Sequence, residues 1–306
     1  MEKKYELLED DTLSWNSLEG EPITLYRIRA LKDFDCPVKE DSLFNNIINK
    51  GDLGGYIEKE ENLSHEGTCW VFDNAMVYDK AVIKEDAQVS LNAQVYGQAI
   101  MSGQSMATDH AKVYDFAEVR GDALIHYRAE VYGYSVVEDN AAVGGNSKVY
   151  GHAYVGGISH LEGFVEVYDY ARLRFNCLIE DQAKVYGHAI IDKDAFITDH
   201  ATIHGNAMLK GHIRVSGYAS IFKDAKVYGS ANIDFKVTGE DEVIVYTDPT
   251  NPRYIITASA KQDWFNSFGF SGRSKDFMEE ANKLGEEKAS RYKAIVDLHL
   301  ALYNVR

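Results

Sequence analysis

Residues 129–152 read AEVYGY SVVEDN AAVGGN SKVYGH, which are four successive units of six residues built on one pattern. The first position of each unit is Ala or Ser, the third is Val, and the fifth is Gly or Asp. The same unit continues without insertion or deletion from Ala75 to Lys236, which makes 27 units. Their first position is Ala in 20 units and Ser in 4, and their third is Val, Ile or Leu in 25. Such a repeat predicts a solenoid, in which each unit packs against its neighbours.

The alternation within a unit predicts a short strand that ends in a corner. The small first and aliphatic third positions point to one side of a strand, and the variable second and fourth positions point to the other. The fifth and sixth positions are rich in Gly, Asp, Asn and His, which suit a corner with unusual backbone angles. Residues 38–248 contain no proline, as expected where every strand belongs to an unbroken hydrogen-bonded ladder.

The units resemble those of hexapeptide-repeat proteins, whose fold is a left-handed parallel β-helix with three units in each triangular coil. An independent signal supports three: the fourth position is Tyr at every eighteenth residue from Tyr78 to Tyr186, followed in register by His204 and Phe222. We therefore expect an all-β dominated fold. It is a left-handed parallel β-helix of about nine triangular coils, 18 residues per coil, with a small N-terminal β cap and a C-terminal helical segment.

One side of the triangle is predicted to carry two rows of aromatic rings. Rungs of the ladder should lie about 4.8 Å apart, the spacing of adjacent strands. Stacked rings can simply stabilise parallel coils, or they can form a recognition surface. The residues of the candidate binding surface are Tyr96, Tyr114, Phe116, Tyr132, Tyr134, Tyr150, His152, Tyr168, Tyr170, Tyr186 and His188.

The chain divides into a capping domain (1–56), the repeat (57–239) and a C-terminal extension (240–306). In the cap we expect a strand over Ile23–Ala30 and a turn over Gly51–Tyr56 that leads into the first coil. An open solenoid end exposes unpaired backbone groups, so a cap is physically required.

In the extension, Pro249 and Pro252 mark a break after the repeat. Ser274 is predicted to cap a first helix, and Gly285 to separate it from a second. The second helix carries one apolar stripe, formed by Tyr292, Ile295, Val296, His299, Leu302 and Tyr303. We expect this helical hairpin to pack against the solenoid.

Composition excludes several classes of function. Lys and Arg number 32 against 48 Asp and Glu, a net charge of −16, and no segment is basic enough to neutralise a run of phosphates. Direct nucleic-acid binding is therefore not expected. No apolar run is long enough to span a membrane, and the N-terminus does not read as a signal peptide. Three widely spaced cysteines fit a reducing compartment, so a cytoplasmic location is expected.

A closer resemblance rests on the segments LYRIRALKDF (25–34), KGDLGGYIEKE (50–60), NLS (62–64) and WV (70–71). These resemble the opening of the YdcK-like proteins, bacterial and prophage-borne β-helix proteins that are often labelled transferases. The resemblance covers the cap and the repeat. It implies a fold and a mobile-element setting, and it implies no catalytic residues.

Two classes of function remain open. We expect a non-catalytic binding or scaffolding protein that recognises a protein partner and needs no cofactor. Outward apolar residues at the second position, such as Val82, Ile100 and Val136, also suggest a homo-oligomer, a trimer or dimer. The alternative is a hexapeptide-repeat acyltransferase that uses acetyl-CoA, although the repeat has no extruded loop.

No metal site is predicted from the sequence, and catalytic residues remain unknown. His200 and His204 are four residues apart, but this spacing crosses a corner rather than one face of a helix. His152 and His188 lie two coils apart, about 9.6 Å at strand spacing, which is too far to share one ion.

Overall fold

The computed structural model describes residues 2–36, 47–237, 243–248, 251–260, 263–267 and 270–303. The repeat forms a parallel β-solenoid of about 10 turns with about 18 residues per turn, which confirms the predicted fold class. The chain separates into two compact units, Met1–Tyr170 and Ala171–Arg306, and each is described by itself.

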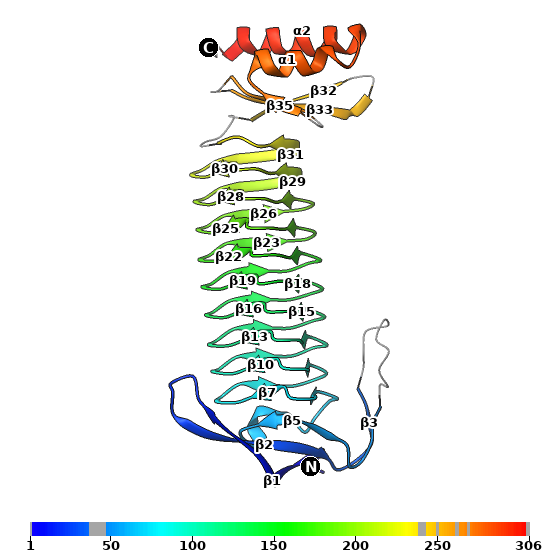
Figure 1. Cartoon of the computed structure of the whole chain (residues 1–306), viewed down its shortest axis with the longest axis vertical. Coiled ribbons are helices and arrows are strands. Elements are labelled where there is room, and N and C mark those ends of the chain that lie inside the picture. The colour runs from blue at the N-terminus through cyan, green and yellow to red at the C-terminus, as the bar shows by residue number, and fades with distance from the viewer. Residues whose placement is uncertain are drawn as a thin grey trace. The chain divides into compact units, whose positions relative to one another are not determined.

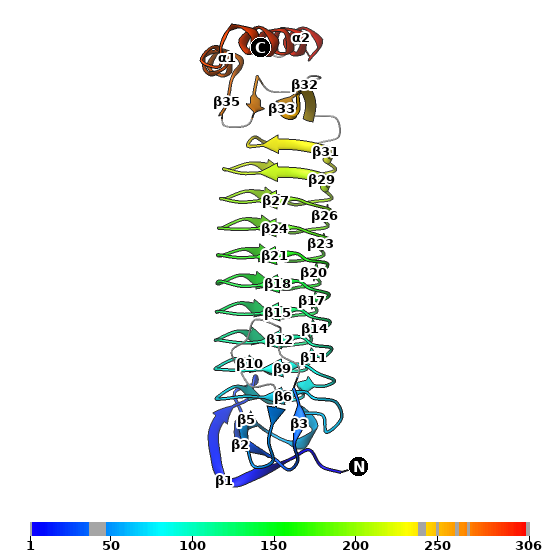
Figure 2. The ribbon, with the colours of Figure 1, turned by 90° about the vertical axis from the view of Figure 1, so that its right-hand side faces the viewer.

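In the first unit, each coil contributes one two-residue strand to each of three parallel faces. Figures 1 and 2 show the strands of a face lying one above another. Face A carries the tyrosines and comprises β7 (Met76–Val77), β10 (Gln94–Val95), β13 (Lys112–Val113), β16 (Glu130–Val131), β19 (Lys148–Val149) and β22 (Glu166–Val167). Face B comprises β8 (Val82–Ile83), β11 (Ile100–Met101), β14 (Glu118–Val119), β17 (Val136–Val137) and β20 (Tyr154–Val155). Face C comprises β6 (Trp70–Val71), β9 (Gln88–Val89), β12 (Met106–Ala107), β15 (Leu124–Ile125), β18 (Ala142–Val143) and β21 (His160–Leu161).

The core lies inside the coils and consists of the first and third positions of the units. Ala129, Val131, Val137 and Ala141, for example, are all fully buried. Residues paired between neighbouring coils are 18 apart, as Glu130 is with Lys148. This register places equivalent positions of successive coils directly above one another. Side chains at one position therefore form a continuous row along a face.

The corners depend on one left-handed residue in each unit. Every fifth position from Gly67 to Gly229 has a positive φ, whether it is Gly or not. Where this residue is acidic, its carboxylate commonly accepts a hydrogen bond from the backbone N–H of the corner in the next coil. Asp79 accepts from Gly97 at 3.1 Å, and Asp115 accepts from Gly133 at 3.2 Å. Acidic residues tolerate this conformation and join adjacent corners, which explains their frequency there.

The N-terminal cap extends face A with antiparallel strands. β1 (Tyr5–Asn16) pairs with β2 (Pro22–Ala30), and β2 pairs with β5 (Leu53–Ile57), which lies parallel to β7. The strand expected over Ile23–Ala30 is thus present. The expected turn over Gly51–Tyr56 is wrong, because most of this segment is β5. The cap also contains β3 (Phe34–Asp35), β4 (Ile47–Ile48) and the short 3-10 helix η1 (Glu60–Asn62).

In the second unit, the coils end in two eight-residue strands. β29 (Met208–Val215) and β31 (Lys226–Ile233) pair along their whole length, so that two successive units of the repeat form one strand. The other solenoid strands of this unit are β23 (Arg172–Arg174), β24 (Leu178–Ile179), β25 (Lys184–Val185), β26 (Ile190–Asp192), β27 (Phe196–Ile197), β28 (Thr202–Ile203) and β30 (Ser220–Ile221).

A four-stranded antiparallel sheet follows the last coil. Its strands are β32 (Val243–Asp248), β33 (Asn251–Ser259), β34 (Phe265–Ser267) and β35 (Phe270–Gly272). Among the described residues, hydrogen bonds join this part of the chain to the end of the solenoid. Asn232 of β31 donates its backbone N–H to Thr257 Oγ1 at 2.9 Å, and Trp264 Nε1, just before β34, donates to Asp234 Oδ1, just after β31, at 2.8 Å. The predicted boundary at 239/240 and Pro249 lie outside the described residues.

The two predicted helices are present, as α1 (Ser274–Asn282) and α2 (Glu286–Tyr303). Their apolar faces pack on the four-stranded sheet, where Phe277 and Val296 join Ile256 and Phe265 in one buried cluster. The expected packing against the solenoid itself is therefore corrected: in the described residues this cluster contains no residue of the coils. Neither described helix is long and apolar enough to span a membrane.

Two details of the helix predictions also change. Ser274 is the first residue inside α1 rather than its cap. Asp263 performs that role in part, because its carboxylate accepts hydrogen bonds from the Ser274 backbone N–H and hydroxyl, each at 3.0 Å. In the predicted stripe on α2, Tyr292, Val296 and His299 are buried and Ile295 is partly buried, whereas Leu302 and Tyr303 are exposed.

Candidate functional site

The inner row of rings on face A is a continuous stack within the first unit. Neighbouring ring centroids are 4.8–5.0 Å apart from Tyr78 to Tyr168, with interplanar angles of 0–4°. This spacing matches the strand spacing, because each ring projects from the same position of successive coils. Beyond Tyr78, the rings are half-buried, since each one covers the faces of its neighbours. The members are Tyr78, Tyr96, Tyr114, Tyr132, Tyr150 and Tyr168.

The outer row forms a second stack at the adjoining corner. Phe116, Tyr134, His152 and Tyr170 have centroids 4.6, 5.0 and 4.8 Å apart in succession, with angles of 5–9°. All four side chains are exposed; Phe116, Tyr134 and Tyr170 retain 43%, 55% and 51% of their accessible surface. The two stacks run side by side over four coils, which makes one aromatic strip. We call these four residues the outer stack and the tyrosines from Tyr78 to Tyr168 the inner stack.

Alternating charges flank the inner stack. In the pairing register, Lys112, Glu130, Lys148 and Glu166 lie on successive strands, so that opposite charges are neighbours. The Lys148 ammonium lies 3.4 Å from the Glu130 carboxylate. These pairs are partly exposed, so we expect them to contribute little to stability, and to keep the strip close to neutral.

The phenols of Tyr96, Tyr114 and Tyr150 in the inner stack are held in their protonated form. Burial raises the pKa of Tyr96, Tyr114 and Tyr150 well above the ordinary value, and nearby carboxylates act in the same direction. Two hydroxyls donate to the charged row: Tyr114 to Glu130 Oε2 at 3.4 Å and Tyr150 to Glu166 Oε2 at 3.2 Å. These two hydroxyls thus take part in bonds within the solenoid.

The β1–β2 hairpin covers the first rung of the inner stack. Tyr78 is only 4% exposed and packs with Leu25, while Leu13 and Ile23 lie against the same cluster. At the hairpin end, the Leu18 backbone N–H donates to Asp79 Oδ2 at 3.1 Å. The open aromatic strip therefore begins above the hairpin.

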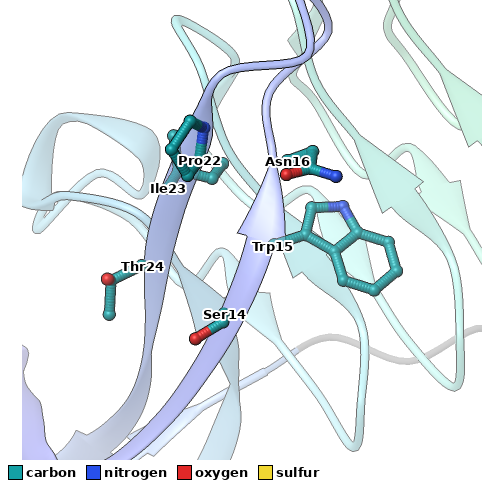
Figure 3. Close-up of a pocket in the computed structure, with 6 residues that line it drawn as sticks. All are labelled: Ser14, Trp15, Asn16, Pro22, Ile23 and Thr24. Atoms are coloured by element: carbon teal, nitrogen blue, oxygen red, sulfur yellow. The ribbon is translucent and has the colours of Figure 1, made fainter.

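A shallow depression lies at the end of the same hairpin (Figure 3). It is lined by Ser14, Trp15, Asn16, Pro22, Ile23 and Thr24. The Trp15 ring extends from β1 beside Asn16, while Ser14 and Thr24 point to the other side of the hairpin. This depression is open and shallow, and its lining has no titratable side chain.

Nine of the eleven predicted binding residues are thus brought together in the first unit. Tyr186 and His188 belong to the second unit. There, Tyr186 stacks on His204 at 4.6 Å, and His204 stacks on Phe222 at 4.9 Å. His200 stacks instead on Tyr218, so that His200 and His204 belong to different rows.

The structure brings His126 and His160 together with Glu162. One ligand atom from each lies within 4.8 Å of those from the other two. The sequence contained a signal for this: residues 126, 144 and 162 share one position at intervals of 18, and the middle one is Gly. Two coils of separation do not keep side chains apart when the coil between them has no side chain.

No model of a known protein family matches the chain, and a comparison with curated proteins finds no significant relative. The inference of function therefore rests on the chemistry of the surfaces described above.

Proposed function

We propose that the protein is a binding or scaffolding protein, and that the aromatic strip of the first unit recognises a protein partner. The observation that carries the proposal is the outer stack, in which four consecutive coils each expose an aromatic ring at the same corner. Exposed aromatic clusters are typical of protein–protein interfaces, where their burial supplies most of the binding energy.

The two stacks support different roles. The inner stack is half-buried and two of its hydroxyls bond within the solenoid, so its main contribution is to the stability of the coils. The outer stack leaves about half of its ring surface open to water. Because each outer ring stacks on at least one neighbour, it has little conformational freedom to lose on binding, which favours affinity.

The charge around the strip indicates the kind of partner. Lys and Glu alternate along face A, so the strip offers no net field for a strongly charged ligand. Flat rings in a neutral setting suit apolar side chains and Arg guanidinium groups, which stack on aromatic faces. We therefore infer a partner that presents such side chains from a flat or extended surface.

A triple variant, Phe116→Ser, Tyr134→Ser and Tyr170→Ser, tests the proposal. These side chains are exposed, so the solenoid should stay folded while the strip loses its rings. The matched control is Tyr127→Ser with Phe164→Ser, which removes rings that are 54% and 62% exposed at other corners.

The measurement is affinity capture from the source cells, followed by titration of the captured protein against each purified variant. We expect the triple variant to bind at least tenfold more weakly and the control to bind like the unmodified chain. Equal affinity of the triple variant and the unmodified chain, with both folded by circular dichroism, would remove the strip from the interface.

A further inference from the structure

Face C carries a cluster of potential metal ligands, and this cluster is separate from the aromatic strip on face A. Strands β15, β18 and β21 lie on successive coils, with Leu124 paired to Ala142 and Ala142 paired to His160. His126 follows β15, Gly144 follows β18 and Glu162 follows β21, all at the fourth position of their units. His160 is the second position of the same unit as Glu162.

The middle coil provides the space in which the side chains meet. His126 and Glu162 start about 9.6 Å apart, two strand spacings, and both lean over Gly144. A Cβ atom added at Gly144 would lie 2.5 Å from His126 Nε2 and 2.3 Å from Glu162 Oε2. The neighbouring second position on this coil is Ala142, which is also small. The nitrogen and oxygen atoms therefore converge over the one coil that leaves room for them.

The backbone does not explain the glycine. Gly144 is not among the residues with positive φ, whereas the next residue, Gly145, has φ 64° and forms the corner. The neighbouring coils carry Thr108, His126 and Glu162 at the position that Gly144 occupies. The same position accepts larger side chains on the neighbouring coils. The effect of glycine at 144 is therefore to leave room for the side chains of His126 and Glu162.

The state of His126 also fits a ligand. Its Nε2 atom is buried and has no hydrogen-bond partner among the described residues, although a carboxylate lies nearby. Such an unsatisfied atom costs free energy unless something binds it.

We propose that His126, His160 and Glu162 form a Zn²⁺ site on face C. Two imidazoles and one carboxylate are a ligand set that zinc takes at sites with an open fourth position. The His160 Nε2 to Glu162 Oε2 distance is 3.7 Å. Tetrahedral zinc with bonds of 2.0–2.1 Å needs its ligands ~3.4 Å apart, and the three ligand atoms, all within 4.8 Å of one another, need to approach by at most ~1.4 Å.

The fourth position of this site faces solvent. The side chain of His160 is 49% exposed and that of Glu162 40% exposed, so the ion is reached from the open surface. A water molecule is the expected fourth ligand.

Zinc titration of the full chain, stripped of metal with a chelator, tests the proposal. Calorimetry with ZnCl₂ should show one ion per chain at micromolar affinity or tighter, and Co²⁺ should give the visible spectrum of a tetrahedral site. The decisive variant is Gly144→Ala, which keeps all three ligands and fills the space between them. Its Cβ meets only the ends of side chains, so the fold should tolerate it. We expect at least a tenfold loss of affinity.

Two further variants complete the test. Glu162→Gln removes one ligand charge with almost no change of shape and should also weaken binding at least tenfold. His110→Ala removes an exposed imidazole at a corner and should bind zinc like the unmodified chain. The proposal is overturned if the unmodified chain binds no zinc at micromolar concentration. It is equally overturned if Gly144→Ala and Glu162→Gln both bind as tightly as His110→Ala.

Discussion

Replacing Tyr132 with Ala in the middle of the inner stack should destabilise the first unit by about 2.5–5.5 kcal/mol. Its ring contacts Tyr114 at 4.8 Å and Tyr150 at 4.9 Å, and each stacked pair contributes about 0.5–1.5 kcal/mol beyond the area it buries. The remainder comes from apolar surface, because truncating a fully buried aromatic ring costs about 3–5 kcal/mol and this ring is half-buried. Tyr132→Phe keeps the ring and should change stability by less than about 0.5 kcal/mol.

The assay is denaturant unfolding of the full chain, followed by circular dichroism and by tyrosine fluorescence. A double-mutant cycle on Tyr132 and Tyr150 should give a coupling of about 1 kcal/mol, since these rings touch. The same cycle on Tyr96 and Tyr150, three coils apart, should be additive. If Tyr132→Ala costs less than about 1 kcal/mol, or if the adjacent pair shows no coupling, the inner stack does not stabilise the coils as argued.

Two other predictions concern corners and pH. Leu91 has φ 56° at a corner, so Leu91→Gly should raise the free energy of unfolding by about 0.5–1 kcal/mol. Gly217 has φ 66° and open space around it, so Gly217→Ala should lower the free energy of unfolding by a similar amount through backbone strain alone. Equal melting temperatures for both variants would contradict the strain at these corners. Burial raises the pKa of Tyr78 from 10.0 to about 12. The folded state then keeps a proton that the unfolded state loses, so stability is complete below pH 10 and falls by roughly 2–3 kcal/mol as the pH rises towards 12. Denaturation at pH 9 and pH 11.5 should show this fall, and Tyr78→Phe should make it smaller; an unchanged slope would refute the assignment.

Most of the solenoid could be read from the order of residues. Equivalent positions of successive coils lie next to one another. A pattern that repeats every 6 and every 18 residues therefore shows which residues are in contact. For this reason the strands, the buried Ala and Val positions, the left-handed corners and the stacking of Tyr114 on Tyr132 were all predictable. Each of these depends on a residue and its copy 18 positions away.

The structure outside the repeat depends on contacts between segments that no sequence period relates, so it could not be predicted in the same way. Strand β1 was not foreseen, because it forms by pairing with β2 and covers Tyr78, which lies far along the chain. The sheet under α1 and α2 was missed for the same reason, and so the helices were expected on the solenoid.

The cluster on face C lies between these two cases. The register that aligns His126, Gly144 and Glu162 is present in the sequence, but the convergence of their side chains is a property of the folded surface. Neither the strand pattern nor the corner pattern requires glycine at position 144. The effect of this glycine is to leave a space on face C. Only packing in three dimensions shows that a nitrogen and an oxygen from coils two apart meet in that space, since side-chain reach, unlike strand register, does not follow the period.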